Sequence, residues 1–210
     1  MTKVALFAGG ELSYYDRKHD YFVGIDRGSL FLLAQKLPLD LAVGDFDSVS
    51  AAELALIRSQ ARELLVAAPE KDDTDTELAL KAVFSRFPHC QATLYGAFGG
   101  RLDHFLSNIF LPSHPELAPF MQQICLRDAS NLVRYLPAGK HQIIATPGFD
   151  YVSFLPEEAQ QFSIIGAKYE LTRDTYFKRK NYSSNAFIGK PIEVSLESGY
   201  LIVIESKDRS

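Results

Sequence analysis

Two short acidic segments carry the side chains of this sequence that are best suited to chemistry. The first covers residues 44–48 (GDFDS) and the second covers residues 71–77 (KDDTDTE), and together they hold six carboxylates. Clustered carboxylates repel one another unless a cation offsets their charge, and their oxygens suit hard divalent cations. The two segments therefore predict a divalent-cation site, with a polyphosphate as its natural third component.

In the first segment, Asp45 and Asp47 are two residues apart. If the segment is extended, both carboxylates fall on one face and can share a cation, while Phe46 points the other way into the core. The alternative is an Asp-rich turn before a helix that begins near Ser50, where short polar side chains accept from free backbone N–H groups. Ser48 or Ser50 could form that cap without either Asp, so both interpretations stay open.

In the second segment, Thr74 and Glu77 have the spacing of a capping box, which predicts a helix that begins at Asp75. Acidic residues in a first turn also favour the helix dipole. These local effects explain Thr74, Asp75 and Glu77. They do not explain Asp72, which precedes the cap beside Lys71, so we expect Asp72 and Asp75 to bind the cation together with the first segment.

A glycine-rich segment at residues 96–104 (GAFGGRLDH) follows an apolar run and opens a helical pattern. Its glycines let the backbone approach a phosphate at a helix N-terminus, and Arg101 adds a planar, permanently charged fork. The Lys-Ser or Lys-Thr ending of a Walker motif is missing. The alternative is a plain glycine turn, with Asp103 near the helix N-terminus and His104 as a structural hydrogen-bonding residue.

The elements that must position these segments alternate along the first half of the chain. Short apolar runs predict strands at residues 4–8, 21–25, 39–43 and 92–95, and helical spacing predicts helices at 30–37, 51–64 and 75–87. This order predicts an α/β domain with a mostly parallel sheet, whose ligands bind outside the carboxyl ends of the strands. Each acidic or glycine-rich segment follows such an apolar run.

The second half has a different texture. Prolines crowd residues 112–119, and a boundary is expected between residues 112 and 130. After it, β-rich runs punctuated by glycines occur at 132–136, 141–145, 151–155, 162–165, 167–171, 192–196 and 201–204. These runs predict an all-β, antiparallel sandwich or barrel-like domain. We place the division at 1–122 and 123–210.

Composition limits the classes of protein that remain. The 210 residues are 47% hydrophobic and 23% charged with a net charge of −4, which excludes disordered and collagen-like chains. The sequence has no basic stripe with interleaved aromatics, so no nucleic-acid partner is expected. No apolar run reaches about 18 residues, and the apolar start is too short for a signal peptide, so we expect no membrane span and a cytoplasmic location. Cys90 and Cys125 are the only cysteines and have no paired spacing, which favours a reducing compartment.

Taken in order, these motifs resemble the bacterial type of thiamine pyrophosphokinase. The matching parts are residues 26–28 (DRG in place of Asp-Gly-Gly), 44–48, 71–75, 99–104 with Asn108, and 184–185. They span nearly the whole chain. Each motif alone is weak, but the order and intervals of four of them are specific.

The resemblance implies an N-terminal α/β catalytic domain and a C-terminal β-sandwich that helps to bind thiamine. It implies a homodimer whose site lies between the catalytic domain of one subunit and the sandwich of the other. The implied reaction moves a diphosphoryl group from ATP to the hydroxyethyl oxygen of thiamine, which gives thiamine diphosphate and AMP.

The resemblance also implies roles for individual residues. Mg²⁺ would be held by Asp45, Asp47, Asp72 and Asp75. The catalytic residues would be Asp47, Asp75, Arg101 and Asp103, with Arg101 on phosphate and Asp103 either completing the acidic ring or orienting the hydroxyl. Nucleotide or thiamine would be bound by Asp26, Lys71, Thr74, Gly100, Arg101, His104, Asn108, Ser184 and Asn185, and Asp26 would belong to the acidic ring.

The chain departs from the family pattern in two ways. Arg27 replaces a glycine of the first motif, which places a long cation where the family has bare backbone. The chain also has no Trp to stack on thiamine, so Tyr176, Phe177 or Tyr182 would have to do so.

Two alternatives belong to other classes. A pyrophosphokinase for another hydroxyalkyl heterocycle, such as a pterin, would keep the acidic ring and change the pocket. A non-catalytic thiamine or nucleotide sensor would lose the ring, and the intact acidic residues argue against it. The sequence does not separate thiamine from another acceptor, because function lies in the site rather than in the fold.

Overall fold

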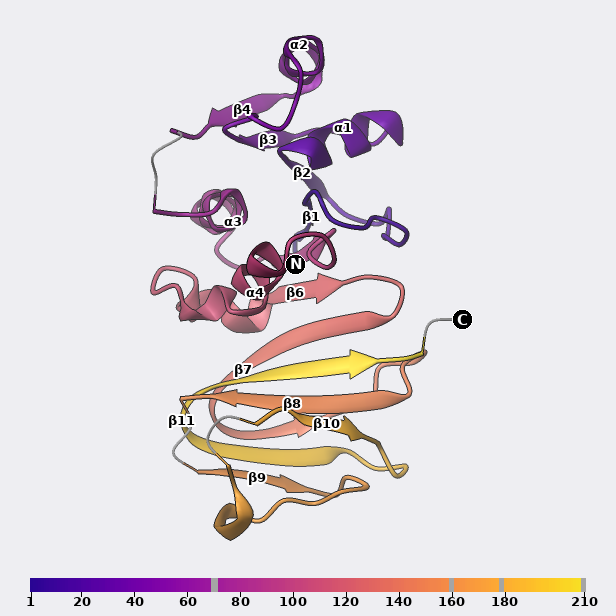
Figure 1. Cartoon of the computed structure of the whole chain (residues 1–210), viewed down its shortest axis with the longest axis vertical. Coiled ribbons are helices and arrows are strands. Elements are labelled where there is room, and N and C mark those ends of the chain that lie inside the picture. Colours follow the sequence, from indigo (N-terminus) through magenta and orange to yellow (C-terminus); the bar gives the residue numbers. More distant parts are fainter. Residues whose placement is uncertain (69–71, 159–160, 178–179, 209–210) are drawn as a thin grey trace. The chain divides into compact units, whose positions relative to one another are not determined.

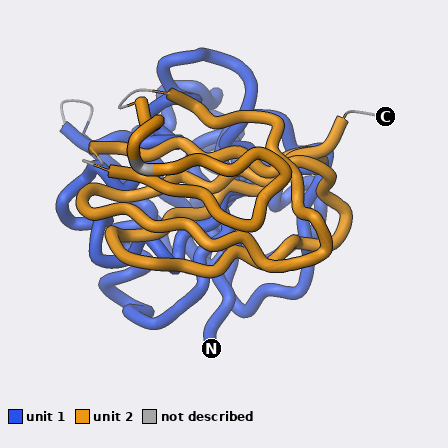
Figure 2. Tube along the Cα trace, turned by 90° about the horizontal axis from the view of Figure 1, so that it is seen from below, with its two compact units in different colours: residues 1–129 blue, residues 130–210 orange. Residues whose placement is uncertain are grey.

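The computed structural model describes residues 1–68, 72–158, 161–177 and 180–208. The chain divides into two compact units, residues 1–129 and 130–210 (Figure 2). Strand β6 (Ile124–Arg127) belongs to the first unit because it pairs with β5 (Gln91–Tyr95). The functional division at 122/123 expected from the sequence stays a prediction. None of the helices in the described part of the chain has both the length and the apolar composition needed to span a membrane.

The first unit is built on a parallel sheet, as the alternation of strands and helices predicted. Its strand order is β6-β5-β1-β2-β3-β4, and the described pairings between these strands are all parallel (Figure 1). The remaining strands are β1 (Lys3–Phe7), β2 (Tyr21–Ile25), β3 (Leu41–Gly44) and β4 (Glu63–Val66). Parallel strands run in one direction, so the segments after β2, β3 and β5 emerge at the same edge of the sheet.

Helices cover this sheet. Leu32 of α1 (Arg27–Ala34) and Ile57 of α2 (Ala51–Gln60) are fully buried in one core cluster with Phe7 and Phe22 of the sheet. The helix α3 (Asp75–Arg86) packs against β2 and β3, and α4 (Leu102–Ile109) follows the glycine-rich segment. The predicted capping box of α3 is present, and Ser50 forms a second one with Glu53 at the start of α2.

The predicted helix over residues 51–64 is wrong in its last turn. The helix ends at Gln60, and residues 63–66 form strand β4. The cause is long-range pairing, because the backbone N–H groups of Arg62 and Glu63 donate to the carbonyls of Leu39 and Asp40 at 3.0 and 3.1 Å. Helical periodicity could not reveal these acceptors, which belong to a distant segment.

The second unit is antiparallel. It contains β7 (Asn131–Ile143), β8 (Tyr151–Glu157), β9 (Phe162–Ile165), β10 (Tyr182–Asn185) and β11 (Ile192–Ser206). β11 pairs with β7 on both sides of a register shift, with β9 before it and with β8 after it. Side chains from both halves of β11 share one core cluster, so the sheet folds back over itself.

The strand predictions in this unit are corrected in three places. Residues 132–136 and 141–143 belong to one continuous strand, β7, and residues 192–196 and 201–204 belong to another, β11, because these two long strands pair with each other on both sides of the register shift. Residues 144 and 145 lie beyond the end of β7. The predicted strand at 167–171 is not formed, and only isolated bridges occur at its two ends. The chain turns there because Gly166 has a φ of +81° and its N–H donates to the Glu170 carboxylate at 2.7 Å.

Candidate functional site

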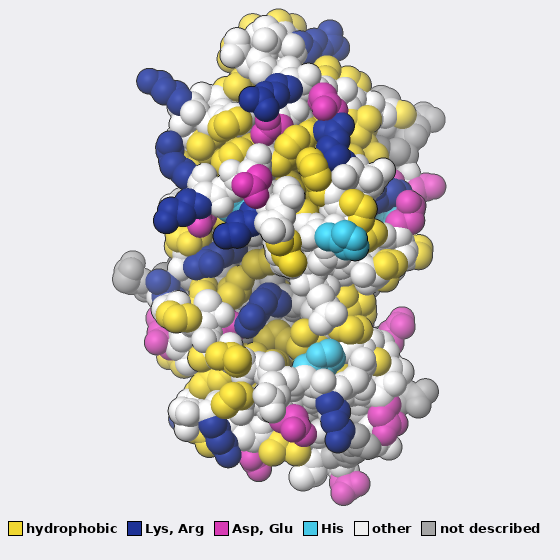
Figure 3. Space-filling model, turned by 180° about the vertical axis from the view of Figure 1, so that it is seen from behind, with side chains coloured by type: hydrophobic (Ala, Val, Ile, Leu, Met, Phe, Trp, Pro, Cys, Tyr) yellow, Lys and Arg dark blue, Asp and Glu magenta, His cyan; other side chains and the backbone are white. Residues whose placement is uncertain are grey.

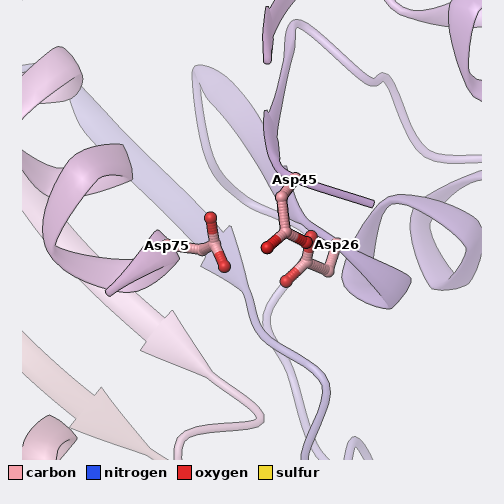
Figure 4. A group of neighbouring side chains, drawn as sticks. All are labelled: Asp26, Asp45 and Asp75. Atoms are coloured by element: carbon pink, nitrogen blue, oxygen red, sulfur yellow. The ribbon is translucent and has the colours of Figure 1, made fainter. Parts of the chain in front are cut away.

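Three carboxylates meet at the carboxyl edge of the parallel sheet. Asp26 follows β2, Asp45 follows β3 and Asp75 is the first residue of α3. One carboxylate oxygen of each lies within 4.8 Å of the others, and all three residues are partly buried. Figure 4 shows the three side chains pointing toward one another. The structure therefore brings one residue of each acidic segment, Asp45 and Asp75, together with Asp26, which the family resemblance places in the same ring.

The backbone around this carboxylate group is shaped for close approach. A Cβ atom at position 44, where glycine has a φ of +153°, would lie 1.9 Å from Oδ1 of Asp26. The same Oδ1 accepts a hydrogen bond from the N–H of Phe46 at 3.2 Å. Asp26 and Phe46 have φ values of +46° and +60°, which non-glycine residues rarely adopt. Such strain persists where surrounding structure enforces it, and it concentrates at functional sites.

The electrostatics of the group favour a cation. Burial, followed by the nearby charge of Asp75, raises the pKa of Asp26 to about 7. Three ionised carboxylates at this spacing in a partly buried place repel one another, so their fully charged state is unfavourable without a cation. Carboxylate oxygens from three chain segments match the hard oxygen ligands that Mg²⁺ takes from proteins. The residues present therefore fit a divalent cation.

Asp47 and Asp72 lie outside this group of three. The premise that residues 45–47 are extended is wrong, because Phe46 has a positive φ and the N–H of Asp47 donates to Oδ1 of Asp45 at 3.0 Å. This turn leaves the side chain of Asp47 exposed, and Asp72 is also exposed. Arg27 donates to the carbonyl of Ser48 at 3.1 Å and so ties the turn to the start of α1. Metal binding by Asp47 and Asp72 stays a prediction.

The second acidic segment carries two further predicted residues. The hydroxyl of Thr74 accepts from the N–H of Glu77 at 3.2 Å, and the N–H of Thr74 donates back to Glu77 at 2.7 Å. Thr74 therefore fixes the first turn of α3 and the place of Asp75. Lys71, predicted to bind nucleotide, lies outside the described residues.

The glycine-rich segment leads from β5 into α4. Gly100 has a φ of +70°, and nothing lies within 4 Å of where its Cβ would be. Arg101 stands at the exposed helix start and binds Asp103 at 2.5 Å, and its hydrogen bond lowers the pKa of Asp103 to about 2. His104 is exposed. Asn108 is buried, and its amide donates to the carbonyl of Ala97 at 3.0 Å. This hydrogen bond fixes the glycine-rich segment to α4.

The second unit contains a separate hollow of about 350 Å³, whose wall includes Phe177, Tyr182 and Asn185. Asn185 is buried, and its amide donates to the carbonyl of Tyr169 at 2.7 Å and accepts from the N–H of Tyr169 at 2.9 Å. The adjacent Ser184 is exposed and has a φ of +57°. The ring of Tyr176 packs instead against Phe162 of the core, 6.4 Å between centroids.

Comparison with known proteins matches both units. The family description "Thiamin pyrophosphokinase, catalytic domain" fits residues 12–122, and "Thiamin pyrophosphokinase, vitamin B1 binding domain" fits residues 140–201. The thiamine pyrophosphokinase of Bacillus subtilis (strain 168) is 33% identical over 218 residues, which cover 99% of this chain and 100% of that protein. The chain belongs to the thiamine pyrophosphokinase family.

Solved structures agree with this membership. A thiamin pyrophosphokinase family protein from Enterococcus faecalis is 39% identical, with a TM-score of 0.92 over 99% of this chain and 100% of that one. Yeast thiamin pyrophosphokinase shares the fold, with a TM-score of 0.79 at 14% identity over 98% of this chain and 86% of that one.

The protein is therefore an enzyme that attaches a diphosphate to thiamine. Neither the pterin enzyme nor the non-catalytic sensor is favoured by these matches.

The surface of the protein mixes side chains of different kinds. On the face shown in Figure 3, basic, acidic and apolar side chains are interspersed.

Sequence reasoning did not single out every residue that shapes the site. Gly44 was noted only as part of a motif, and its contact with Asp26 comes from a distant segment. Asn108 was predicted to bind nucleotide or thiamine, and its hydrogen bond to the carbonyl of Ala97 was not foreseen. Asp73 and His114 were given no role, yet they bind each other beside Asp75. No local pattern marks this last pair, because the two residues are far apart in the chain.

Proposed function

We propose that this enzyme transfers the diphosphate of ATP to the hydroxyethyl oxygen of thiamine, with thiamine diphosphate and AMP as products. The observation that carries the proposal is the group formed by Asp26, Asp45 and Asp75 at the carboxyl edge of a parallel sheet. Phosphoryl-transfer enzymes do little covalent chemistry of their own and depend on positioning and charge stabilisation. A carboxylate group and a glycine-rich helix start that follow strands at the same edge of the sheet suit both tasks.

In this proposal Asp26, Asp45 and Asp75 hold Mg²⁺ directly, and Asp47 and Asp72 complete the acidic ring. Bound Mg²⁺ neutralises charge on the transferred phosphates. The protein residues fix where that charge is placed. The strained backbone at Asp26 and the capped start of α3 keep two of the carboxylates in position before substrate arrives.

The phosphates are held by the glycine-rich segment and its flanking residues. Arg101 is exposed, and its ion-pair partner Asp103 is an exposed residue two positions along the chain. The guanidinium can therefore exchange that carboxylate for a phosphate when nucleotide binds. Asp103 is then free to orient the thiamine hydroxyl. Gly100 leaves the backbone open to phosphate. Lys71, Thr74 and His104 complete the set of residues that bind nucleotide or thiamine.

The second unit serves as the β-sandwich domain that recognises thiamine. Phe177 is exposed and Tyr182 partly so, and both line the hollow, so they are the proposed stacking partners of the thiamine rings. Ser184 contacts thiamine directly, and Asn185 holds the wall of the hollow. The enzyme acts as a cytoplasmic homodimer whose site combines the first unit of one subunit with the second unit of the other.

One incubation tests the reaction. Purified protein with ATP, Mg²⁺ and thiamine should give AMP and thiamine diphosphate in equal amounts, measured by chromatography against time. Release of ADP with thiamine monophosphate as the first product would contradict transfer of a diphosphate, since it would indicate attack at the γ-phosphorus.

Subunit mixing tests the shared site. In a twofold dimer with sites built across the interface, Asp45→Asn and Asn185→Ala each damage both sites when present alone. Randomly mixed, about half of the dimers pair one variant with the other, and each of those carries one intact site. About a quarter of the parental activity should return if each variant alone is nearly inactive. No recovery in dimers shown by mass to be mixed would place each site within one chain.

A further inference from the structure

Asp73 lies in the second acidic segment but outside the carboxylate group, and both of its oxygens are engaged. Lys81 of α3 donates to Oδ2 at 2.8 Å, and Nε2 of His114 lies 3.0 Å from Oδ1. The side chains of these three residues are only 21%, 22% and 17% exposed, respectively. Partly buried ion pairs are screened less than surface pairs, so this is a stronger contact than an ordinary surface ion pair.

Glu116 closes these contacts into a ring. Its carboxylate accepts from Lys81 at 2.7 Å, and its backbone N–H donates to Nδ1 of His114 at 3.1 Å. Because Nδ1 is an acceptor here, the proton of the neutral imidazole sits on Nε2, which then donates to Asp73. We call the four residues Asp73, Lys81, His114 and Glu116 the acidic-segment brace.

Apolar packing supports the brace. The segment after Glu116 continues into the 3-10 helix Ala118–Gln123, and Phe120 there stacks on Phe84 of α3 with centroids 4.4 Å apart and an interplanar angle of 3°. Phe84 and the neighbouring Leu117 are buried. The brace thus joins the residue before the N-cap of α3 to a segment that is anchored in the core.

We propose that Asp73 is a positioning residue, which holds the N-terminus of α3 so that the Asp75 carboxylate stays beside Asp26 and Asp45 when no cation is bound. This inference rests on the proposed function of that group as a cation site. Like charges at this spacing repel, and the easiest relief is for α3 to move its first residue away. Only Thr74 separates Asp73 from Asp75, so an anchored Asp73 resists that movement.

The test measures cation affinity directly, without nucleotide or turnover. Mn²⁺ binding to the metal-free protein is followed by electron paramagnetic resonance in the parent and in Asp73→Ala. Loss of a residue that orients metal ligands typically weakens affinity by about tenfold or more, so we expect at least that increase in Kd for Mn²⁺. Because saturating metal pulls Asp75 back, kcat at saturating Mg²⁺ should change by less than about threefold.

A matched control comes from the other end of the same helix. Glu63→Ala removes the ion pair that Arg86, the last residue of α3, makes at 2.5 Å, and it should leave the Kd for Mn²⁺ unchanged. His114→Phe removes the donor to Asp73 and should weaken Mn²⁺ binding in the parent but add little in Asp73→Ala, because both changes act through one contact. Asp73→Asn, which keeps one oxygen acceptor, should recover part of the affinity.

The outcomes separate the two levels of the argument. Parent protein that binds Mn²⁺, with Asp45→Asn weakened and folded Asp73→Ala unchanged within twofold, would overturn the brace and keep the cation site. Binding that Asp45→Asn leaves untouched would overturn the cation site, and the positioning role with it. If Asp73→Ala does not fold, His114→Phe decides by the same comparison, and an unchanged Kd there overturns the proposal.

Discussion

Position 44 can hold only glycine if Asp26 is to keep its place, because a Cβ atom there would lie 1.9 Å from Oδ1 of Asp26. The carboxylate of Asp26 reaches its two partners by passing directly over this backbone. The glycine of the first acidic segment therefore serves the site through contact with a residue from the preceding strand end.

Gly44→Ala should both destabilise the protein and damage the cation site. The backbone φ of +153° and the clash with Asp26 should cost about 2 kcal/mol or more of unfolding free energy, measured by urea denaturation. Mn²⁺ affinity should fall as well. Gly9→Ala is the control, since nothing lies within 4 Å of its Cβ position, and equal losses in both variants would contradict this role.

Asp45→Asn should lower kcat by about a hundredfold or more at saturating Mg²⁺, since metal charge stabilisation is worth several kcal/mol. Folding should survive, and the metal-free variant should melt no lower than the metal-free parent because repulsion is relieved. Asp47→Asn provides the comparison that the sequence could not make. If Asp47 binds metal, Asp47→Asn should lower kcat as much as Asp45→Asn does. If Asp47→Asn keeps more than half of the parental activity, Asp47 is not part of the acidic ring.

The stability of the metal-free protein should fall as pH rises. The pKa of Asp26 is about 7 in the folded state, against 3.8 for an ordinary Asp, so the folded state binds the proton more tightly. Its stabilising contribution is complete below about pH 4 and is lost as pH rises through about 7. Urea midpoints in EDTA should therefore fall between about pH 5 and pH 8 in the parent.

Asp26→Asn should remove this part of the pH dependence, because the amide does not titrate. Addition of Mg²⁺ at the higher pH should restore stability to the parent but not to the variant, since a cation replaces the proton as the neutralising charge. An unchanged slope in Asp26→Asn would assign the pH dependence to other groups.

Arg101→Gln should raise the KM for ATP by about tenfold, in line with the loss of a charge-assisted phosphate contact. Its unfolding free energy should hardly change, because Arg101 and Asp103 are 71% and 62% exposed and surface ion pairs contribute little. Steady-state kinetics and urea denaturation measure the two effects. A change in kcat with an unaltered KM would instead assign Arg101 to the reacting phosphorus.

Local patterns in the sequence were enough to predict the parts of the protein that depend on local physics. The capping box of Thr74 and Glu77 places Asp75 at the first turn of α3, because its hydrogen bonds lie within one turn. The strand runs of the first half and the antiparallel texture of the second follow from periodicity that each segment carries by itself.

Only the tertiary structure decided what depends on distant segments. Residues 63–66 become a strand because β3 and the residues before it offer backbone partners. The turn at Phe46 moves Asp47 away and leaves Asp45 to meet Asp26 and Asp75. The brace around Asp73 needs His114 and Glu116 from the other side of α4 in the chain. Each of these features depends on contacts between residues that are distant in the sequence. A short local pattern cannot predict such contacts.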